Sequence, residues 1–246
     1  AIIPHESTCI LIMENIQTFS QGSNLYASFR PQYPEGLFEY LAKNSKDHSL
    51  AWDCGTGTGQ AACSCAKFFT RVIATDISQE QIHNRATHPR VHYLVMPAER
   101  TAFPAKSFDL VIVAQAVHWF NRDAFFSEVN RVLKPGGLLA IWGYGFPQIN
   151  PEIDSIINEK LGRVIDPYWA EGNRLLMSGY RDIHLHFTEL VSPNSFSITV
   201  EWDLPLLLSY FRTWSAVKLY IDRTGHDPLD RIEVDYYHPG LKIEKQ

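Results

Sequence analysis

The sequence predicts an α/β fold in which a parallel β-sheet is doubly wound, with helices on both of its faces. Three observations lead to this. Short apolar runs alternate with longer mixed segments from residue 49 to residue 144, the pattern of chains that alternate strands with helices. The run FDLVIVAQ is almost entirely apolar, as a strand covered on both faces requires. A glycine-rich turn separates the first strand from the helix after it, at Gly55, Gly57 and Gly59.

Each element of this region has its own signal. Five strands are expected, at SLAWDCG, RVIATDI, VHYLVM, FDLVIVAQ and LLAIWGY. Three helices are expected between them, at GQAACSCAKFF, QEQIHNRA and AFFSEVNRVLK. Ser78 can cap the second helix and Asn121 or Asp123 the third, because short polar side chains accept hydrogen bonds from free N–H groups at a helix start. The segment from Lys134 to Gly137 ends the third helix.

The pattern changes after residue 145. Helices are expected at NPEIDSIINEKLGRVI, RLLMSGYRD and DLPLLLSYFRTWSAVKLYI, and strands at FSITVEW and in the tail from residue 231. We therefore expect two regions. Residues 17–144 would form the core with a helical N-terminal cap over 17–44. Residues 145–246 would form an inserted lid or substrate region, with C-terminal strands that complete the sheet.

Composition excludes several classes of protein. The 246 residues carry a net charge of −5, and Lys and Arg are not clustered, so neither nucleic acid nor an anionic membrane surface is an expected partner. No apolar run approaches the roughly 18 residues of a membrane helix. The four cysteines form no disulfide framework and no zinc-binding spacing. We expect a cytoplasmic monomer or homodimer that binds no metal and acts on a small molecule.

The strongest chemical signal is the segment from Asp53 to Gly59, with the spacing D-x-G-x-G-x-G after a strand and before a helix. Glycines allow positive φ and let a ligand approach the backbone, and the helix start offers free N–H groups. Asp76 ends the next strand, 23 positions after Asp53, where a carboxylate can accept both ribose hydroxyls. The third glycine comes one residue earlier than in a dinucleotide fingerprint, which favours an adenosyl amino acid.

With these motifs, residues 17 to 145 resemble the class I S-adenosylmethionine-dependent methyltransferases. The resemblance implies a Rossmann-like, seven-stranded, mostly parallel sheet with one antiparallel strand, and S-adenosylmethionine above the strand ends. In this resemblance the glycine turn would run alongside the methionine part of the cofactor. Asp76 would hold the ribose, and Ala98 and Glu99 would lie beside the adenine. The implied cofactor-binding residues are Asp53, Gly55, Thr56, Gly57, Gly59, Asp76, Ile77, Ala98, Glu99 and Gln115.

A narrower resemblance is to the subgroup that contains trans-aconitate methyltransferase. Five sequence segments typical of this subgroup occur in order along the chain, namely FSQGSNLYASFRPQYP, AQAVHWF, LLAIWGYG, PYW and YFRTWSAV. This resemblance implies a small-molecule acceptor, and we expect a carboxylate oxygen of an organic acid. The alternatives are a C- or O-methyltransferase of a quinone or lipid precursor, and a protein that binds S-adenosylmethionine without turnover.

Two candidate catalytic residues follow. His118 comes after the fourth strand, at the edge of the sheet where ligands bind; it is either a general base or a histidine that fixes a loop. Arg30 either pairs with a carboxylate of cofactor or substrate or lies on the surface. A substrate pocket, or alternatively the core of the lid, would be formed by Tyr26, Trp119, Trp142, Tyr144, Trp169, Arg212 and Trp214.

Overall fold

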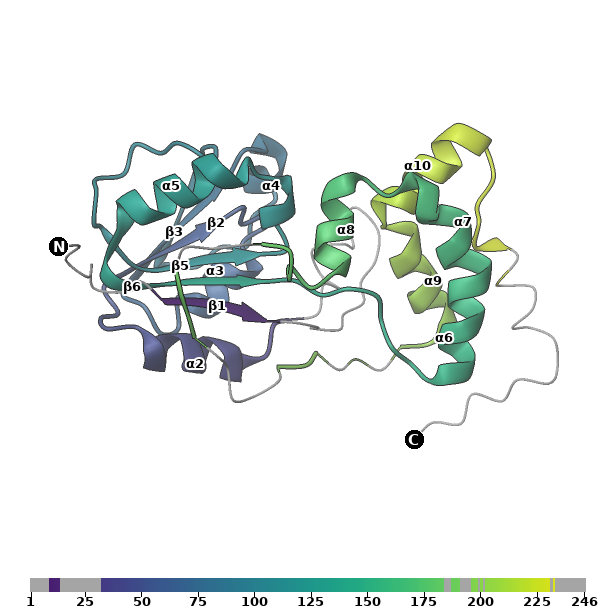
Figure 1. Ribbon diagram of the computed structural model, residues 1–246, viewed down its shortest axis with the longest axis horizontal. Coiled ribbons are helices and arrows are strands. Elements are labelled where there is room, and N and C mark those ends of the chain that lie inside the picture. Colours follow the sequence, from purple (N-terminus) through teal and green to yellow (C-terminus); the bar gives the residue numbers. More distant parts are fainter. Residues whose placement is uncertain are drawn as a thin grey trace. The chain divides into compact units, whose positions relative to one another are not determined.

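The structure is a computed structural model that describes residues 9–13, 32–183, 187–190, 196–198, 200, 202–230 and 232 (Figure 1). The chain divides into two compact units. The described residues of the first unit lie in 9–13, Gln32–Gly145 and Leu175–Ile198. Those of the second unit lie in Phe146–Arg174 and from residue 200 onward. Within the region after residue 145, residues 175–198 thus group with the first unit.

The first unit is built on a parallel sheet whose strands run in the order β4-β3-β2-β5-β6-β1-β7. The Rossmann-like region supplies five of them, which are β2 (Leu50–Cys54), β3 (Arg71–Asp76), β4 (Val91–Val95), β5 (Phe108–Ala114) and β6 (Leu133–Trp142). From β2 the chain adds β3 and β4 on one side, and β5 and β6 on the other. The carboxyl ends of β2 and β5 thus flank the switch point at which such sheets bind ligands.

The α/β class and the parallel five-stranded core agree with the sequence prediction, whereas the rest of the expected seven-stranded sheet differs. Beyond β6 the sheet continues with the strands β1 (Cys9–Met13) and β7 (Thr188–Glu189), of which β7 has two residues. Every strand pair of the described residues is parallel, so the described sheet has no antiparallel strand. Of the tail from residue 231, where C-terminal strands are expected, the structure describes Ile232 alone, which is not in a strand. Pairing at a sheet edge depends on long-range contacts, which local sequence patterns do not encode.

Helices cover both faces of this sheet (Figure 1). They are α2 (Glu35–Asn44), α3 (Gln60–Cys65), α4 (Gln79–His83), the 3₁₀ turn η1 (Val117–Trp119) and α5 (Arg122–Val132). Ser78 caps α4 by accepting from the N–H of Gln81, as predicted. Of the two candidates for α5, Asn121 is the cap, because its side chain accepts from the N–H of Ala124.

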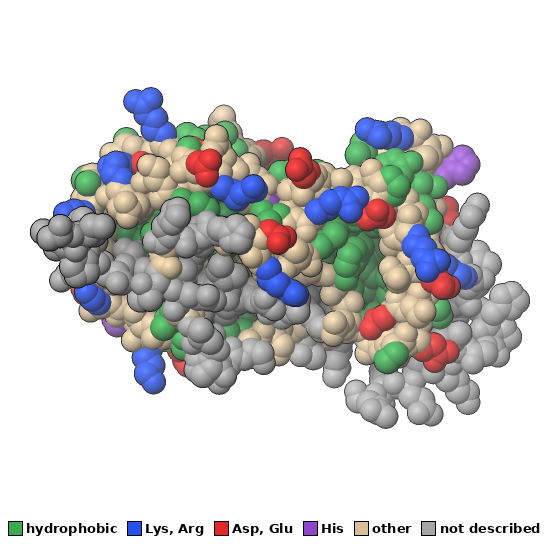
Figure 2. All heavy atoms as spheres, in the orientation of Figure 1, with side chains coloured by type: hydrophobic (Ala, Val, Ile, Leu, Met, Phe, Trp, Pro, Cys, Tyr) green, Lys and Arg blue, Asp and Glu red, His purple; other side chains and the backbone are tan. Residues whose placement is uncertain are grey.

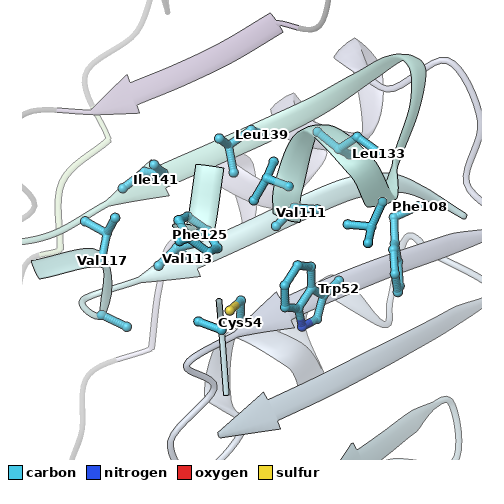
Figure 3. Packing of buried hydrophobic residues seen from close by; sticks show 14 of the residues in the cluster. Trp52, Cys54, Phe108, Val111, Val113, Val117, Phe125, Leu133, Leu139 and Ile141 are labelled. Atoms are coloured by element: carbon cyan, nitrogen blue, oxygen red, sulfur yellow. The ribbon is translucent and has the colours of Figure 1, made fainter. Parts of the chain in front are cut away.

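Alternating residues of β6 face the two layers, as the pleat of a strand requires. Leu139 and Ile141 belong to a buried cluster with Phe125 of α5 and Val111 of β5 (Figure 3). Trp142 has its ring centroid 6.1 Å from that of Phe38 in α2. The central strands are therefore enclosed on both faces, and their carboxyl ends are free to carry chemistry.

The second unit is helical among its described residues. Its elements are α6 (Pro151–Ile157), the π-helical turn η2 (Asn158–Gly162), α7 (Arg163–Ile165), η3 (Asp166–Tyr168), α9 (Leu204–Arg212) and α10 (Ser215–Thr224). Helix α8 (Glu171–Met177) crosses the boundary between the units. Buried apolar side chains of these helices form a separate cluster that includes Leu161, Phe211 and Val217.

Two expectations for this region are wrong. The single helix expected over 203–221 is broken at Trp214, whose φ of −65° and ψ of 136° are extended. Trp214 packs against Phe211 and Phe146, with ring centroids 4.7 and 5.1 Å away, and this aromatic packing outweighs helix propensity. The described residues of FSITVEW are not in a strand.

Charges of both signs are interspersed on the face of the molecule in Figure 2, without a broad basic patch among the described residues in view. None of the described helices is both long and apolar enough to cross a bilayer.

Candidate functional site

The glycine turn after β2 is folded tightly over the end of β3. The N–H groups of Gly55 and Thr56 both donate to the carbonyl oxygen of Thr75, at 2.8 and 2.9 Å. Gly55, Gly57 and Gly59 all have positive φ, of 71°, 56° and 88°. Side chains are disfavoured in this left-handed region, so the backbone itself explains the alternating glycines.

Asp76 is held at the end of β3 by two backbone groups. Its Oδ2 accepts from the N–H of Gly57 at 2.9 Å, and its Oδ1 accepts from the N–H of Ser78 at 2.8 Å. An ionised carboxylate has about four acceptor sites, so it retains capacity for two hydroxyl groups. The neighbouring Ile77 is 76% exposed and offers an apolar surface beside this carboxylate. An acceptor for a diol next to an apolar surface fits a nucleoside.

Asp53 lies beneath the turn and not on its surface. The side chain is buried, and its Oδ2 accepts from the hydroxyl of Thr56 at 2.5 Å. Burial raises the pKa of Asp53 to about 7, although hydrogen bonds from Thr56 and from the backbone of Ala62 oppose this. Its contacts show Asp53 supporting the turn through Thr56.

A second loop approaches Asp76 from the end of β4. The N–H of Met96 donates to the carbonyl oxygen of Asp76 at 3.0 Å, and Ala98 is buried. The carboxylate of Glu99 accepts from the N–H of Asn121 at 3.0 Å. Glu99 therefore joins this loop to the start of α5.

Gln115 connects the ends of β5 and β6. It has a positive φ of 58°, and its N–H donates to the carbonyl oxygen of Trp142 at 2.8 Å. Its side-chain amide donates to the carbonyl oxygen of Tyr144 at 3.3 Å. The strained backbone turns the chain out of β5 and into η1, which carries His118.

His118 is buried, and its Nδ1 lies 2.9 Å from the hydroxyl of Tyr180. Burial lowers the pKa of His118 to about 4, so the imidazole is neutral at pH 7. The adjacent Trp119 is 60% exposed, with its ring centroid 4.9 Å from that of His118. Tyr180 was not among the predicted site residues, and it lies 62 positions away in the segment that returns to the first unit. No local pattern marks it.

The described residues of the expected pocket are divided between the two units. Trp142 is fully buried, with Tyr33 and Phe38 packed edge-on against it. In the first unit, Trp119 is exposed, and Tyr144 contributes the carbonyl oxygen bound by Gln115. Tyr26 and Arg30 lie outside the described residues.

The other three expected pocket residues lie in the second unit. The ring centroids of Trp169 and Trp214 are 5.6 Å apart, and Phe146 packs edge-on against both. The Nε of Arg212 lies 2.6 Å from the carboxylate of Asp227. Arg212 is thus already paired with an anion inside its own unit.

Comparisons with known proteins agree with this geometry. Residues 52–141 match the family described as "Methyltransferase domain". A protein of Dictyostelium discoideum named "Putative methyltransferase" is 33% identical over 219 residues, which cover 87% of this chain and 83% of the relative. A Saccharomyces cerevisiae protein named "Probable S-adenosylmethionine-dependent methyltransferase" is 26% identical, with 77% of each chain covered.

A solved structure is also similar. It is described as "a Putative Type II Methyltransferase from Anaeromyxobacter dehalogenans", and it is 39% identical to this chain with a TM-score of 0.77. The match covers 86% of this chain and 91% of the other.

The parallel sheet, its glycine turn and the carboxylate at the end of β3 define a Rossmann-like enzyme of the nucleoside-cofactor type. The chain belongs to the class I S-adenosylmethionine-dependent methyltransferases. It is therefore an enzyme, and its family and fold imply S-adenosylmethionine as the methyl donor.

Proposed function

We propose that this methyltransferase transfers the methyl group to a small organic acid, and that the accepting atom is a carboxylate oxygen. The observation that carries the proposal is the burial of His118, which keeps the imidazole neutral and weakly basic beside the carboxyl ends of the strands. The resemblance to the trans-aconitate methyltransferase subgroup supports the same acceptor class.

In this proposal the cofactor lies along the glycine turn. Asp76 accepts the ribose hydroxyls through acceptor sites that Gly57 and Ser78 leave free. Ile77 and Ala98 provide the apolar surface for the adenine, with Glu99 and Gln115 holding the surrounding loops. Bound S-adenosylmethionine supplies an electrophilic methyl group on a positively charged sulfur. The protein contributes positioning and the exclusion of water.

The class of methyl acceptor depends on whether the accepting group must lose a proton. A carboxylic acid is already ionised at neutral pH and needs no base, whereas a hydroxyl or an acidic carbon must lose a proton. With its pKa lowered to about 4, His118 is a poor base for those acceptors. Arg212 is paired with Asp227, so Arg30 remains our candidate for orienting the acid.

Cofactor binding is tested first, by calorimetry with S-adenosylhomocysteine. We expect wild type to bind, and Asp76→Asn to bind at least about tenfold more weakly, because hydrogen bonds to a charged acceptor contribute about 1.5–3 kcal/mol. Ser178→Ala is the control, since within the described residues its hydroxyl bonds to Leu175 and Asp182 and not to the glycine turn. Equal affinity in all three proteins would contradict the cofactor assignment.

The acceptor is tested by transfer of a radiolabelled methyl group. Trans-aconitate, a short aliphatic acid and an aromatic acid are each compared with their primary amides, and a phenol and a quinone precursor are included. We expect labelled methyl esters from acids and no product from amides. Product from the phenol or quinone alone would establish the alternative acceptor class. Cofactor binding without any product would instead indicate a protein that binds but does not turn over.

A further inference from the structure

We propose that His118 acts as a neutral hydrogen-bond donor through its Nε2–H, and that Tyr180 is the positioning residue that fixes this tautomer. The inference rests on the proposed function in one respect, namely that the molecule bound beside His118 is an anionic oxygen acceptor. The tautomer itself depends on the protein alone.

The Tyr180 hydroxyl determines which nitrogen of His118 carries the hydrogen. Tyr180 is fully buried, and within the described residues the hydrogen-bond partner of its hydroxyl is Nδ1 of His118 at 2.9 Å. Leaving a buried O–H without an acceptor is costly. The hydroxyl must therefore donate to Nδ1. A neutral imidazole carries one hydrogen, so that hydrogen lies on Nε2.

Nε2 of His118 is not an enclosed atom. The buried polar side-chain atoms without a partner in the described chain are Asp53 Oδ1, Trp142 Nε1 and Asn173 Oδ1. Nε2 of His118 is not one of them, and no hydrogen bond to it occurs among the described residues. An atom that has no partner and is not enclosed is accessible to solvent or to a ligand. The Nε2–H group is thus available to donate.

This donor lies in a segment beside the glycine turn. His118 lies between Ala116 and Phe120, and both of these residues pack against Gly55: a Cβ built on Gly55 would be 2.5 Å from the Cβ of Ala116 and 3.0 Å from the ring of Phe120. The short segment with His118 therefore adjoins the turn at the switch point of the sheet.

This arrangement suits a carboxylate. One carboxylate oxygen accepts the Nε2–H hydrogen bond, while the other forms the new bond to the methyl carbon. The carbon–sulfur bond breaks and its electron pair stays on sulfur, so a carboxylate anion and a sulfonium cation give a neutral ester and a neutral thioether. No proton moves in this step. His118 orients the acceptor and does not deprotonate it.

The tautomer is tested by NMR of protein labelled with ¹⁵N-histidine, which requires neither cofactor nor acceptor. His118→Gln identifies the His118 signals by their loss. We expect Nδ1 to be unprotonated and Nε2 protonated between pH 6 and pH 8 in wild type. In Tyr180→Phe we expect a shift of the ring signals or a mixture of tautomers. A hydrogen on Nδ1 in wild type, or an imidazolium at pH 7, would overturn the proposal.

The donor role is tested by kinetics, with trans-aconitate or with whichever acceptor the transfer screen identifies. Glutamine can place an N–H near the position of Nε2, whereas asparagine is too short and alanine has no donor. We expect His118→Gln to retain at least about tenfold more kcat than His118→Ala and His118→Asn, since single oriented donors contribute about 10²–10³-fold. A general base predicts that glutamine is as inactive as alanine, and this result would overturn the donor role.

Tyr180→Phe separates positioning from a merely structural effect. We expect kcat to fall about threefold to tenfold, as for one hydrogen bond, while the affinity for S-adenosylhomocysteine stays within about twofold. Unchanged kcat together with an altered tautomer would show that the tautomer has no role in transfer. If the screen yields a phenol in place of an acid, the proposed acceptor fails, whereas the NMR result still decides the tautomer.

Discussion

Gly55 and Ala116 come from the ends of two different strands, β2 and β5, and lie against one another. A Cβ built on Gly55 would be only 2.5 Å from that of Ala116, and the φ of Gly55 is 71°. Two independent constraints thus require glycine here, one from the backbone and one from packing. The contact joins the turn assigned to the cofactor with the segment that carries His118.

Substitution of Gly55 by alanine should therefore disturb stability and cofactor binding together. We expect the free energy of unfolding to fall by about 2–4 kcal/mol, because a left-handed side chain and an overpacked contact each cost about 1–3 kcal/mol. Urea unfolding and calorimetry with S-adenosylhomocysteine measure the two effects. Gly145→Ala is the control, because nothing lies within 4 Å of its built Cβ. Similar losses in both variants would refute the role of the contact.

The buried carboxyl of Asp53 should make stability depend on pH. Burial raises its pKa from 3.8 to about 7, so between these values the folded chain holds a proton that the unfolded chain has lost. The contribution of Asp53 to the free energy of unfolding should consequently decrease as pH rises from about 4 to about 7. Asp53→Asn should flatten this decrease, since asparagine does not titrate.

Urea unfolding at several pH values checks this expectation. The control is Asp182→Asn, which replaces an exposed carboxylate of the first unit and should keep the wild-type slope. A slope that is the same in wild type and Asp53→Asn would show that Asp53 titrates normally in the folded state.

Glu128 should give the opposite dependence at acid pH. The hydrogen bond from Arg131, assisted by those from Thr101, lowers the pKa of Glu128 from 4.5 to about 2 despite the opposing effect of burial. Its stabilisation should be complete above pH 4.5 and lost as pH falls from 4.5 toward 2. At pH 7 we expect Glu128→Gln to lower the free energy of unfolding by about 1–3 kcal/mol.

The exposed pair of Glu35 and Lys67 provides the comparison for this prediction. Its side chains are more than half exposed, so Glu35→Gln should cost at most about 1 kcal/mol at pH 7. Unfolding curves at pH 7 and pH 3 measure both variants. The expectation fails if the Glu128 variant differs from wild type by the same amount at both pH values.

Arg212 should behave as a structural residue of the second unit. Its Nε lies 2.6 Å from Asp227, and its Nη2 lies 3.7 Å from Asp230. We expect Arg212→Gln and Asp227→Asn each to destabilise the protein, and the double variant to lose about 0.5–1 kcal/mol less than the sum, because both remove one partly exposed ion pair. Strict additivity, with a raised KM only in Arg212→Gln, would instead favour a role in binding the acid.

Local sequence patterns predicted the parts of the structure that depend on local physics. The five strands from Leu50 to Trp142 follow from short apolar runs, and the cap at Ser78 follows from the chemistry of helix starts. The helix expected over 203–221 failed because Trp214 packs with aromatic residues brought in from elsewhere in its unit. The full burial of Trp142 could not be predicted, because hydrophobic patterns do not distinguish a core tryptophan from one that lines a pocket.

By itself, the sequence determined the glycine turn and the acid at the next strand end, because positive φ and strand length restrict these positions to few residue types. The tertiary structure decided which groups meet. It placed Asp53 beneath the turn, paired Arg212 with Asp227, and brought Tyr180 to His118 across 62 positions. Burial and hydrogen bonding depend on such distant neighbours, and these set the protonation of a side chain and hence its chemistry.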